Sequence, residues 1–447
     1  MKRKIATPQI TEGVIWKQLL FFFFPILLGS FFQQMYNTVD TIIVGRAIGT
    51  QALAAVGSCS SLIYLVNGFF IGLSSGATVI LSQHYGAGDR EGAEKALHTG
   101  FFLSLILGGL TTLFGVGAGP WILRLIQTPE NCIDDAIVYV QFYFSGAIAT
   151  MIYNMGTGIL RAMGDSARPT VFLIISCFLN ILLDILLVVV LNLGVAGAAI
   201  ATVLSQIISA VLVTVCLCRL SPEYRLQWKK LLPDRNTLSR ILAIGIPAGL
   251  QFMTYDVSNL ITQSSINSFG DITAAAWTAY AKSDTFIWMV VSASGVAITT
   301  FVGQNYGAGK LDRIRRGTWV CMAMSAACVL LLSSVEVYFR EFILGIYTTD
   351  LAVIQTGAFM VTIAAPFCVL FVPVEVLGGT MRGTGYSLVP TVITSIFACL
   401  FRTLWVMLVV NRWHSLYLLV SCYPISWFLC ATVFCIVYFR GKWLKTA

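Results

Sequence analysis

The most regular feature of the chain is a succession of long apolar stretches separated by short polar segments. A helix that spans a bilayer needs ~20 mostly apolar residues. Backbone groups in lipid must be satisfied within the segment, which favours helices, and the alternation typical of barrel strands is absent. The pattern predicts an all-α membrane protein with twelve spans, at about 15–38, 52–78, 97–119, 135–158, 169–191, 195–218, 238–265, 274–300, 317–339, 354–379, 388–410 and 415–439.

Composition supports a polytopic membrane protein. Apolar residues make up 57% of the chain and charged residues 11%, and the mean hydropathy is +0.83. A soluble domain carries about a quarter charged residues, so this chain has too little charge to cover a water-facing surface. We therefore expect a partner bilayer and no nucleic-acid partner. The 12 Cys are scattered without a C-x-x-C pair, which predicts no metal or haem cofactor.

The distribution of positive charge predicts the orientation. Most of the 28 Lys and Arg residues lie in the N-terminal tail and in alternate loops, whereas Arg46, Arg124, Arg340 and Arg412 lie in the intervening ones. By the positive-inside rule, both termini are cytosolic. The basic N-terminal tail lacks a small-residue cleavage site and is predicted to be retained. We expect a multi-pass protein of a bacterial plasma membrane.

An internal repeat divides the chain. Residues 82–88 (SQHYGAG) return as 303–309 (GQNYGAG), and R-A-M-G at 161–164 returns as R-G-T-G at 382–385, both at an offset of 221 residues. Each half contains six spans, an even number, so the repeat is parallel about an axis along the membrane normal. We predict an N-lobe at 1–220, a cytosolic connector at 221–237, a C-lobe at 238–447 and a central cleft.

The glycine-rich segments of the repeat are predicted to be tight turns between helices. Neither G-A-G-D nor G-A-G-K fits the G-x-x-x-x-G-K-[ST] nucleotide motif. Without a nucleotide site, uphill transport must draw on an ion gradient. Two lobes and a cleft favour a transporter with alternating access over a purely structural protein.

These blocks carry a family resemblance. Pro25 to Asp40, V-G-x-x-x-G, Q-x-Y-G-A-G and the repeated R-x-x-G with a following P-T resemble the multidrug and toxic compound extrusion (MATE) family, over about residues 14–440. The resemblance implies twelve helices in two lobes and export of small organic compounds against inward flow of H⁺ or Na⁺. It also implies a monomer.

Acids within spans are costly and point to function. Six occur, at Asp40, Asp184, Asp256, Asp284, Glu336 and Glu375. Gln33, Asn37 and Asp40 share one helix face, as do Asn180 and Asp184. Thr202 and Asn154 add polar groups from neighbouring spans, and Tyr139 lies on the fourth. Such an oxygen-rich lining suits a hard monovalent cation or a proton, and two adjacent carboxylates that repel each other suit a proton carrier.

The resemblance assigns roles to some of these positions. Asp40 resembles the family's coupling carboxylate in the first helix, and Asn180, Asp184 and Thr202 resemble cation ligands, with Tyr139 and Asn154 nearby. A Na⁺ site is implied only at Asp40, Asn180, Asp184 and Thr202. The alternative is a set of interhelical hydrogen bonds that only hold the N-lobe together.

The second half is less regular. Asp256 and Glu375 lie in the two helices that carry carboxylates in another branch of the family, but Tyr255 and Phe371 occupy the expected registers. We interpret these acids as ion pairs with the two cations within spans, Lys282 and Arg402. Substrate contacts by Gln33, Asn37, Asp256 and Glu375 are the alternative. Two other functions stay open: a flippase for lipid-linked saccharides and a membrane-embedded transferase.

Overall fold

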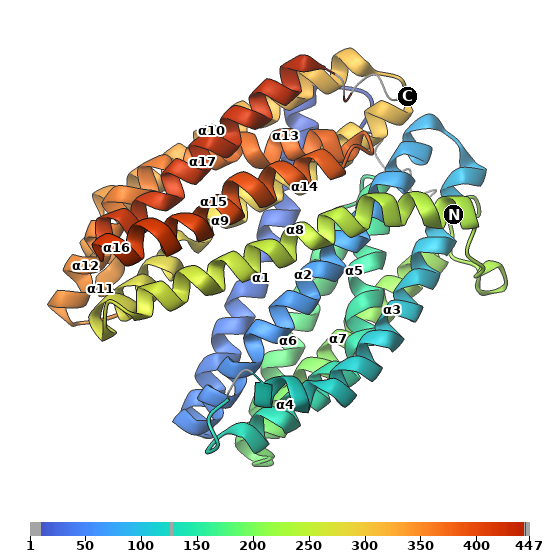
Figure 1. Ribbon diagram of the computed structural model, residues 1–447. Coiled ribbons are helices and arrows are strands. Elements are labelled where there is room, and N and C mark those ends of the chain that lie inside the picture. The colour runs from blue at the N-terminus through green and yellow to red at the C-terminus, as the bar shows by residue number, and fades with distance from the viewer. Residues whose placement is uncertain (1–9, 126–127, 442, 444–447) are drawn as a thin grey trace. The chain divides into compact units, whose positions relative to one another are not determined.

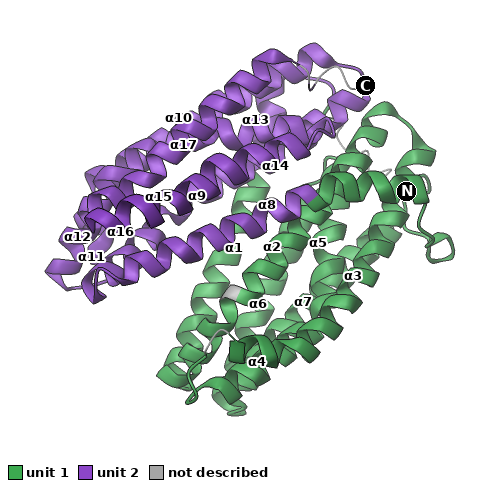
Figure 2. Ribbon diagram, in the orientation of Figure 1, with its two compact units in different colours: residues 1–10, 24–246 green, residues 11–23, 247–447 purple. Residues whose placement is uncertain are grey.

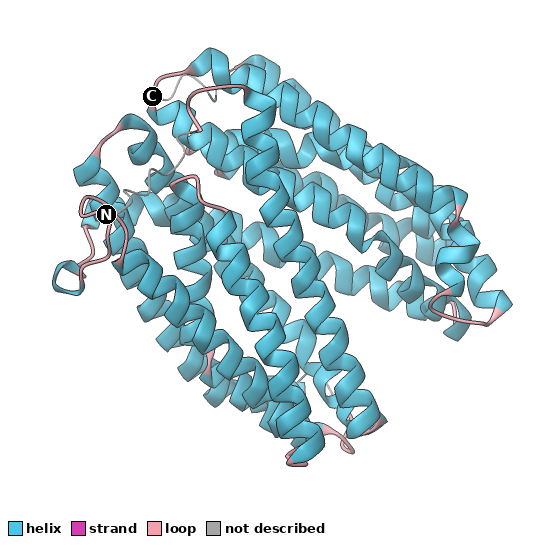
Figure 3. Cartoon of the chain, turned by 180° about the vertical axis from the view of Figure 1, so that it is seen from behind, coloured by secondary structure: helices cyan, strands magenta, loops and turns pink. Residues whose placement is uncertain are grey.

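The computed structural model describes residues 10–125, 128–441 and 443. Within these ranges every regular element is helical, and the helices are joined by short loops (Figure 3). Each of the twelve predicted spans falls on helical structure, eight on a single helix and four (135–158, 169–191, 354–379 and 388–410) on successive helical segments (Figure 1). The predicted N-terminal tail, with Lys2, Arg3 and Lys4, lies outside the described residues, as do Lys442 and Lys445.

Most of the long helices are apolar enough to cross a bilayer. Ten helices in the described ranges are long and apolar enough to cross a bilayer, or eleven when α4 (Ile133–Ser145) and α5 (Ala147–Ala162) count as one span bent by 47°. The seventh predicted span forms α8 (Arg235–Asn267), a continuous helix of 33 residues. Its second half is rich in Gln, Ser, Thr and Asn, so it is not among the apolar ten.

The chain forms two compact units (Figure 2). Unit 1 contains residues 24–246 with the segment ending at Ile10, and unit 2 contains residues 11–23 and 247–447. Two long helices are therefore shared, because α1 (Ile15–Ala47) and α8 each begin in one unit and continue in the other. Each division falls within two residues of a proline, Pro25 in α1 and Pro247 in α8. The predicted domain limits at 220 and 238 remain a prediction.

Unit 1 is a helical bundle around two apolar clusters. Helix α5 packs against α2, α3 and α7, and α4 packs against α3 and α7. Besides α1, α4 and α5, its elements are α2 (Thr50–Ala87), α3 (Arg90–Leu125), α6 (Ala167–Asp184), the π-helix η1 (Ile185–Val190), α7 (Gly194–Cys218) and the 3₁₀-helix η2 (Trp228–Lys230).

Unit 2 is built around α9 (Asp271–Gly307), which packs against α10, α12 and α13. The polypeptide of this unit is interrupted more often than that of unit 1. Its further elements are α10 (Leu311–Tyr338), α11 (Arg340–Gly345), α12 (Leu351–Ala364), η3 (Ala365–Leu370), α13 (Phe371–Gly383), α14 (Leu388–Thr394), η4 (Ser395–Leu400), α15 (Phe401–Trp405), η5 (Val406–Val410), α16 (Asn411–Trp413) and α17 (Leu416–Arg440).

The repeat predicted from the sequence is present in the backbone. Glycines with left-handed φ angles recur at the predicted offset, at Gly49 and Gly270, Gly88 and Gly309, and Gly164 and Gly385. A side chain at such an angle is strained, so glycine is required at each turn. The π-helical segment after Asp184 also recurs, since η1 begins at Ile185 and η5 begins 221 residues later at Val406. The glycine-rich segments end helices α2 and α9 and supply the tight turns, at Gly88 and at 308–309, that lead into the next helix.

Side-chain hydrogen bonds fix the ends of these helices in unit 1. Beside the turn at Gly88, the pKa of Asp89 is lowered because the amide of Gly92 donates to its carboxylate and His84 lies 2.7 Å away. At the start of α8, the amide and hydroxyl of Thr237 donate to Asp234 and lower its pKa. These acids satisfy amides that a helix N-terminus leaves without intrahelical partners.

The segment between α7 and α8 is held against α3. The amide of Gln227 donates to Nε2 of the buried His98 at 3.0 Å, and Nδ1 of His98 lies 2.8 Å from the carbonyl of Glu94. Because that carbonyl can only accept, Nδ1 carries the proton and Nε2 accepts, so the imidazole is neutral. The amide of Asp234 donates to Thr99 at 3.0 Å. The predicted connector is therefore anchored to α3 at two points, Gln227 and Asp234.

Candidate ion-coupling site

Two of the predicted coupling residues are brought together in unit 1. Asp40 on α1 and Asp184 on α6 lie close enough for the charge of each carboxyl group to act on the other, although 144 positions of sequence separate them. Asp184 is fully buried and is the last α-helical residue before the π-helix η1. Single-turn π-helical segments are frequent at functional sites, because the extra residue re-aims neighbouring side chains.

The site contains polar atoms without protein partners. Oδ1 of Asp40, both carboxylate oxygens of Asp184 and both amide atoms of Asn180 are buried and make no hydrogen bond. Asn180 is 1% exposed and lies one helical turn before Asp184. Two ionised carboxylates are both acceptors, so neither satisfies the other unless one is protonated. Buried polar groups without partners are costly, and a bound proton or cation would relieve that cost.

Aromatic side chains surround Asp40 on one side. Tyr139 on α4 and Tyr36 on α1 are both near enough to be influenced by the Asp40 charge. Tyr139 stacks on Tyr143 at 6.2 Å between ring centroids, and Nδ2 of Asn67 donates to the Tyr143 hydroxyl at 2.9 Å. The tyrosines thus place phenol oxygens and ring faces, both attractive to cations, beside the carboxyl pair.

The remaining predicted residues of unit 1 lie at different depths. Thr202 is buried on α7, which packs against α6, the helix of Asn180 and Asp184. Asn154 is half-buried on α5. On α1, Gln33 is exposed and Asn37 is half-buried. The structure therefore unites Asp40, Asp184, Asn180 and Tyr139, and leaves the other four as neighbours on the same bundle.

The ion pairs predicted for unit 2 are wrong. Glu375 pairs with Arg382, seven residues further along α13, at 3.3 Å, and Nη1 of Arg382 also donates to Gln251. Asp256 is half-buried, and no salt bridge is formed by it in the described residues. The prediction failed because residues seven apart, two helical turns, share a face, which makes a partner on the same helix available to Glu375.

The two basic residues predicted as partners, Lys282 and Arg402, form no salt bridge with Asp256 or Glu375 in the described residues. Lys282 is exposed on α9. Arg402 is 2% exposed, its guanidinium lies 4.1 Å from the ring centroid of Tyr423, and Nη1 donates to Asn259 at 3.1 Å. A guanidinium stacked on a tyrosine gains cation–π energy, so Arg402 is held without a carboxylate.

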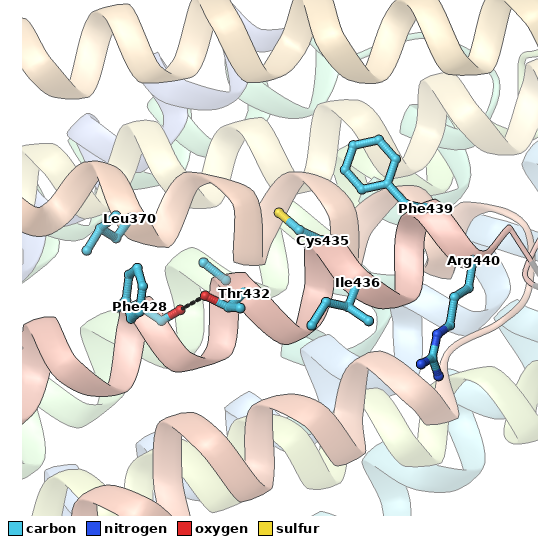
Figure 4. A pocket seen from close by; sticks show the side chains of 8 residues that line it. Leu370, Phe428, Thr432, Cys435, Ile436, Phe439 and Arg440 are labelled. Carbon is cyan, nitrogen blue, oxygen red and sulfur yellow. Dashed lines mark hydrogen bonds between the residues drawn. The ribbon is translucent and has the colours of Figure 1, made fainter.

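A groove of about 640 Å³ lies on unit 2 (Figure 4). Its lining is a strip of α17 with Leu370 from η3: Phe428, Ala431, Thr432, Cys435, Ile436, Phe439 and Arg440. The Thr432 hydroxyl donates to the Phe428 carbonyl of its own helix. No acid lines this groove, so it is separate from the ion chemistry.

Sequence reasoning missed two polar residues of the site. Tyr36 lies four positions before Asp40, and that spacing would have placed it on the same face of α1. Asn67 had no such signal, because it follows an apolar run in α2 and gains its role from the Tyr143 hydroxyl of another helix. The described ranges contain no group of three or more His, Cys, Asp or Glu side chains able to hold a metal ion.

Two repeated bundles of apolar helices, one of them enclosing a carboxyl pair, define a membrane transporter of the two-lobe class. Residues 25–186 and 247–408 each match the MatE family. The probable multidrug resistance protein YoeA of Bacillus subtilis is 30% identical over 407 residues, which cover 88% of this chain and 86% of that protein. A second Bacillus subtilis protein, the probable multidrug resistance protein YpnP, is 33% identical over 309 residues, 68% of each chain.

The fold agrees with these matches. A MOP superfamily transporter from Pyrococcus furiosus superposes with a TM-score of 0.92 over 100% of both chains, at 22% identity. This chain belongs to the MatE family, the multidrug and toxic compound extrusion transporters. The family resemblance and the two-lobe repeat fold are thereby confirmed. Because members of this family are transporters, the prediction that the chain is not an enzyme is confirmed too.

Proposed function

We propose that this transporter exports amphipathic organic cations in exchange for H⁺ or Na⁺, and that the carboxyl pair of Asp40 and Asp184 binds the coupling ion. The supporting observation is the buried pair itself, with oxygens that lack protein donors. A second ionised carboxylate in such a site is disfavoured by the first, so the pair retains a positive ion until another replaces it. This competition couples the ion gradient to export.

The neighbouring residues complete the proposed site. Asn180 supplies an amide oxygen one turn from Asp184, and Thr202 supplies a hydroxyl from the helix packed against α6. Carboxylate, amide and hydroxyl oxygens are the ligands that hard cations prefer. Tyr139 and Asn154 have a supporting role near Asp40 in this proposal. Gln33, Asn37, Asp256 and Glu375 remain candidate contacts for the organic substrate.

We further propose alternating access by two lobes, residues 1–220 and 238–447, joined by the connector 221–237, in a monomer. The supporting observation is that α1 and α8 pass from one unit to the other close to Pro25 and Pro247. A proline inside a helix removes one backbone hydrogen bond and permits bending there. The relatives are bacterial and are named as multidrug resistance proteins, which supports a bacterial plasma membrane with cytosolic termini and organic substrates.

The test is efflux of a fluorescent organic cation from proteoliposomes that contain the full-length protein. Sodium and pH gradients are imposed separately, and the wild-type protein is compared with Asp40→Asn and with Asp134→Asn, an exposed acid of α4 in the same unit. We expect one gradient to drive export, Asp40→Asn to fall to the level of empty liposomes, and Asp134→Asn to match the wild type. Gradient-driven export by Asp40→Asn at the wild-type rate would overturn the assignment.

A further inference from the structure

A second pair of buried acids lies in unit 2, and neither acid belongs to the proposed coupling site of unit 1. Asp284 on α9 is 4% exposed and Glu336 on α10 is 5% exposed. The two carboxyl groups lie near each other, since the charge of Asp284 acts on Glu336. Neither acid forms a salt bridge with a Lys, Arg or His side chain of the described residues. Two buried negative charges without a cation repel each other strongly.

The two acids differ in their hydrogen bonds. Oδ2 of Asp284 accepts from the indole N–H of Trp288 at 2.5 Å and from the hydroxyl of Tyr280 at 3.4 Å. The Cys368 sulfur lies 3.7 Å from Oδ1. An indole N–H can only donate, so Oδ2 of Asp284 must be an acceptor. The indole donor at Oδ2 stabilises Asp284 as a carboxylate, whereas the single thiol hydrogen of Cys368 is shared between Oδ1 and the Ala364 carbonyl 3.8 Å away.

Glu336 has a single donor and one bare oxygen. Its Oε1 lies 2.5 Å from the hydroxyl of Ser283, and its Oε2 is buried without a partner. An ionised carboxylate would leave Oε2 unsatisfied inside the bundle. When one proton is shared by the two acids, these contacts place it on Glu336 and leave the charge on Asp284.

Ser283 connects Glu336 to the backbone in a way that suits both protonation states. Its hydroxyl lies 2.8 Å from the Tyr280 carbonyl as well as 2.5 Å from Glu336, but it has one hydrogen. With Glu336 protonated, the acid donates to Ser283, which donates to the carbonyl. With Glu336 ionised, Ser283 turns and donates to the carboxylate. Rotation of one hydroxyl therefore accommodates gain and loss of the proton without movement of a helix.

Among the described residues no cation pairs with either acid, and Lys282, which precedes Ser283 on α9, is exposed. The titratable groups that influence the pair are Tyr280, Cys368, Tyr347 and, next to Tyr280, Tyr423. Helix α12 has no titratable residue, and on α13 Glu375 and Arg382 pair with each other. On α11, Arg340 donates to the Val337 carbonyl and Glu341 is exposed. Asp284 is thus the group that sets the electrostatic cost of ionising Glu336.

We propose that Glu336 is a second proton-exchange site of this transporter, which binds and releases one proton opposite the fixed charge of Asp284. On binding, a proton passes from hydronium to the carboxylate and leaves water, with no change of oxidation state. The hydrogen bonds of Glu336, Ser283 and Asp284 support proton exchange at this site whether or not the protein is an antiporter. Its contribution to coupling rests on the proposed antiport function, where it adds one proton to each transport cycle driven by a pH gradient.

The direct test is infrared difference spectroscopy of the reconstituted full-length protein between acidic and alkaline buffer. The variants are Glu336→Gln and, as a matched control, Glu341→Gln, the exposed acid on the next helix. We expect one protonated-carboxyl band, present at neutral pH, to disappear in Glu336→Gln and to persist in Glu341→Gln. Ser283→Ala, which removes only the hydrogen-bond partner, shifts the same band. An unchanged band in both Glu336→Gln and Ser283→Ala would overturn the proposal.

A transport measurement separates this proposal from the proposed function. The number of protons exchanged per substrate is obtained from the substrate gradient that balances an imposed pH gradient. We expect Glu336→Gln to lower that number by one while export continues, and an unchanged number would refute a coupling role. If export needs no ion gradient at all, the antiport proposal fails, and the infrared band alone still decides whether Glu336 exchanges a proton.

Discussion

The close crossing of α2 and α8 in unit 1 gives a prediction whose size follows from the backbone. A Cβ atom added at Gly76 would lie 2.3 Å from the carbonyl oxygen of Ile241 and 2.8 Å from the amide nitrogen of Gly245. Gly245 is equally confined, since its own Cβ would lie 2.7 Å from the Leu73 carbonyl. Small residues allow such approach between helices in a membrane. Ordinary carbon contacts need ~3.5–4.0 Å, so Gly76→Ala must move one helix by roughly 1 Å.

The matched control lies on the same helix. An added Cβ at Gly57 has no neighbour within 4 Å, so Gly57→Ala adds a helix-favouring residue to α2 at no steric cost. Overpacking costs ~1–3 kcal/mol, whereas Gly to Ala inside a helix gains ~0.5–1 kcal/mol. Both variants gain that helix propensity, so they should differ by the overpacking cost of ~1–3 kcal/mol, which corresponds to roughly 2–12 °C in the melting temperature of a unit of about 200 residues.

Thiol exposure measures this difference. Buried cysteines such as Cys59 and Cys177 react with a fluorogenic maleimide only when unit 1 opens, whereas Cys328 is exposed and gives a constant background. We expect Gly76→Ala to react at a clearly lower temperature than the wild type, and Gly57→Ala at the same or a higher one. Equal melting of the two variants would show that the crossing is not close-packed and would refute the reasoning.

Two further predictions concern the approach to α8. His98→Leu removes the acceptor of the Gln227 amide and the donor to the Glu94 carbonyl. We expect the free energy of unfolding to fall by ~1–3 kcal/mol and trypsin to cleave the connector faster. An unchanged cleavage rate would count against the anchor. The pKa of Asp234 is lowered in the folded protein, because Thr237 donates to its carboxylate. The cap therefore stabilises α8 fully above the unfolded pKa of about 4 and is lost as pH falls through the lower folded value. Amide exchange in the first turn of α8 should accelerate over that range, and should be insensitive to pH there in Asp234→Asn.

The helices and the repeat were predictable because each depends on local pattern. Apolar length sets a span, and a left-handed turn demands glycine at Gly88 and again at Gly309. The neighbourhood of Asp40 and Asp184 was predictable in part, because the helical spacing of Asn180 and Asp184 fixes a common face. Which other helix faces these side chains depends on packing between distant segments, and so Asn67 was not found, whereas Tyr36 was overlooked although its spacing from Asp40 indicates the same face.

The same reason explains the wrong ion pairs of unit 2. Charge and burial in the sequence make Arg402 expensive, and a carboxylate is the partner that electrostatics alone suggests. In the folded protein the guanidinium of Arg402 contacts the ring face of Tyr423 and the amide oxygen of Asn259. Glu375 forms its salt bridge with Arg382 instead. The packing of neighbouring helices decides between partners of similar energy, and the spacing of charged residues along the sequence does not reveal that packing.

The two carboxyl pairs are not copies of each other, because they lie on helices that do not correspond in the repeat: α1 and α6 in unit 1, and α9 and α10 in unit 2. At the repeat offset of 221 residues, the positions that correspond to Asp40 and Asp184 hold Ile261 and Trp405. Asp284 of the second pair corresponds likewise to an apolar residue, Ile63. The duplicated helix packing is nevertheless kept, since Gly158 approaches Thr78 in unit 1 as Gly379 approaches Thr299 in unit 2.

The helix packing is therefore alike in both halves, whereas each acid pair belongs to one half. Glu336 corresponds to Gly115, where an added Cβ would lie within van der Waals overlap of the Phe144 ring, so unit 1 has no room for a carboxylate at that place. A pair that served only to hold helices together would be expected wherever the same helices cross. Its restriction to one half favours a separate ion-binding role for each pair, which is the distinction that Asp40→Asn and Glu336→Gln measure.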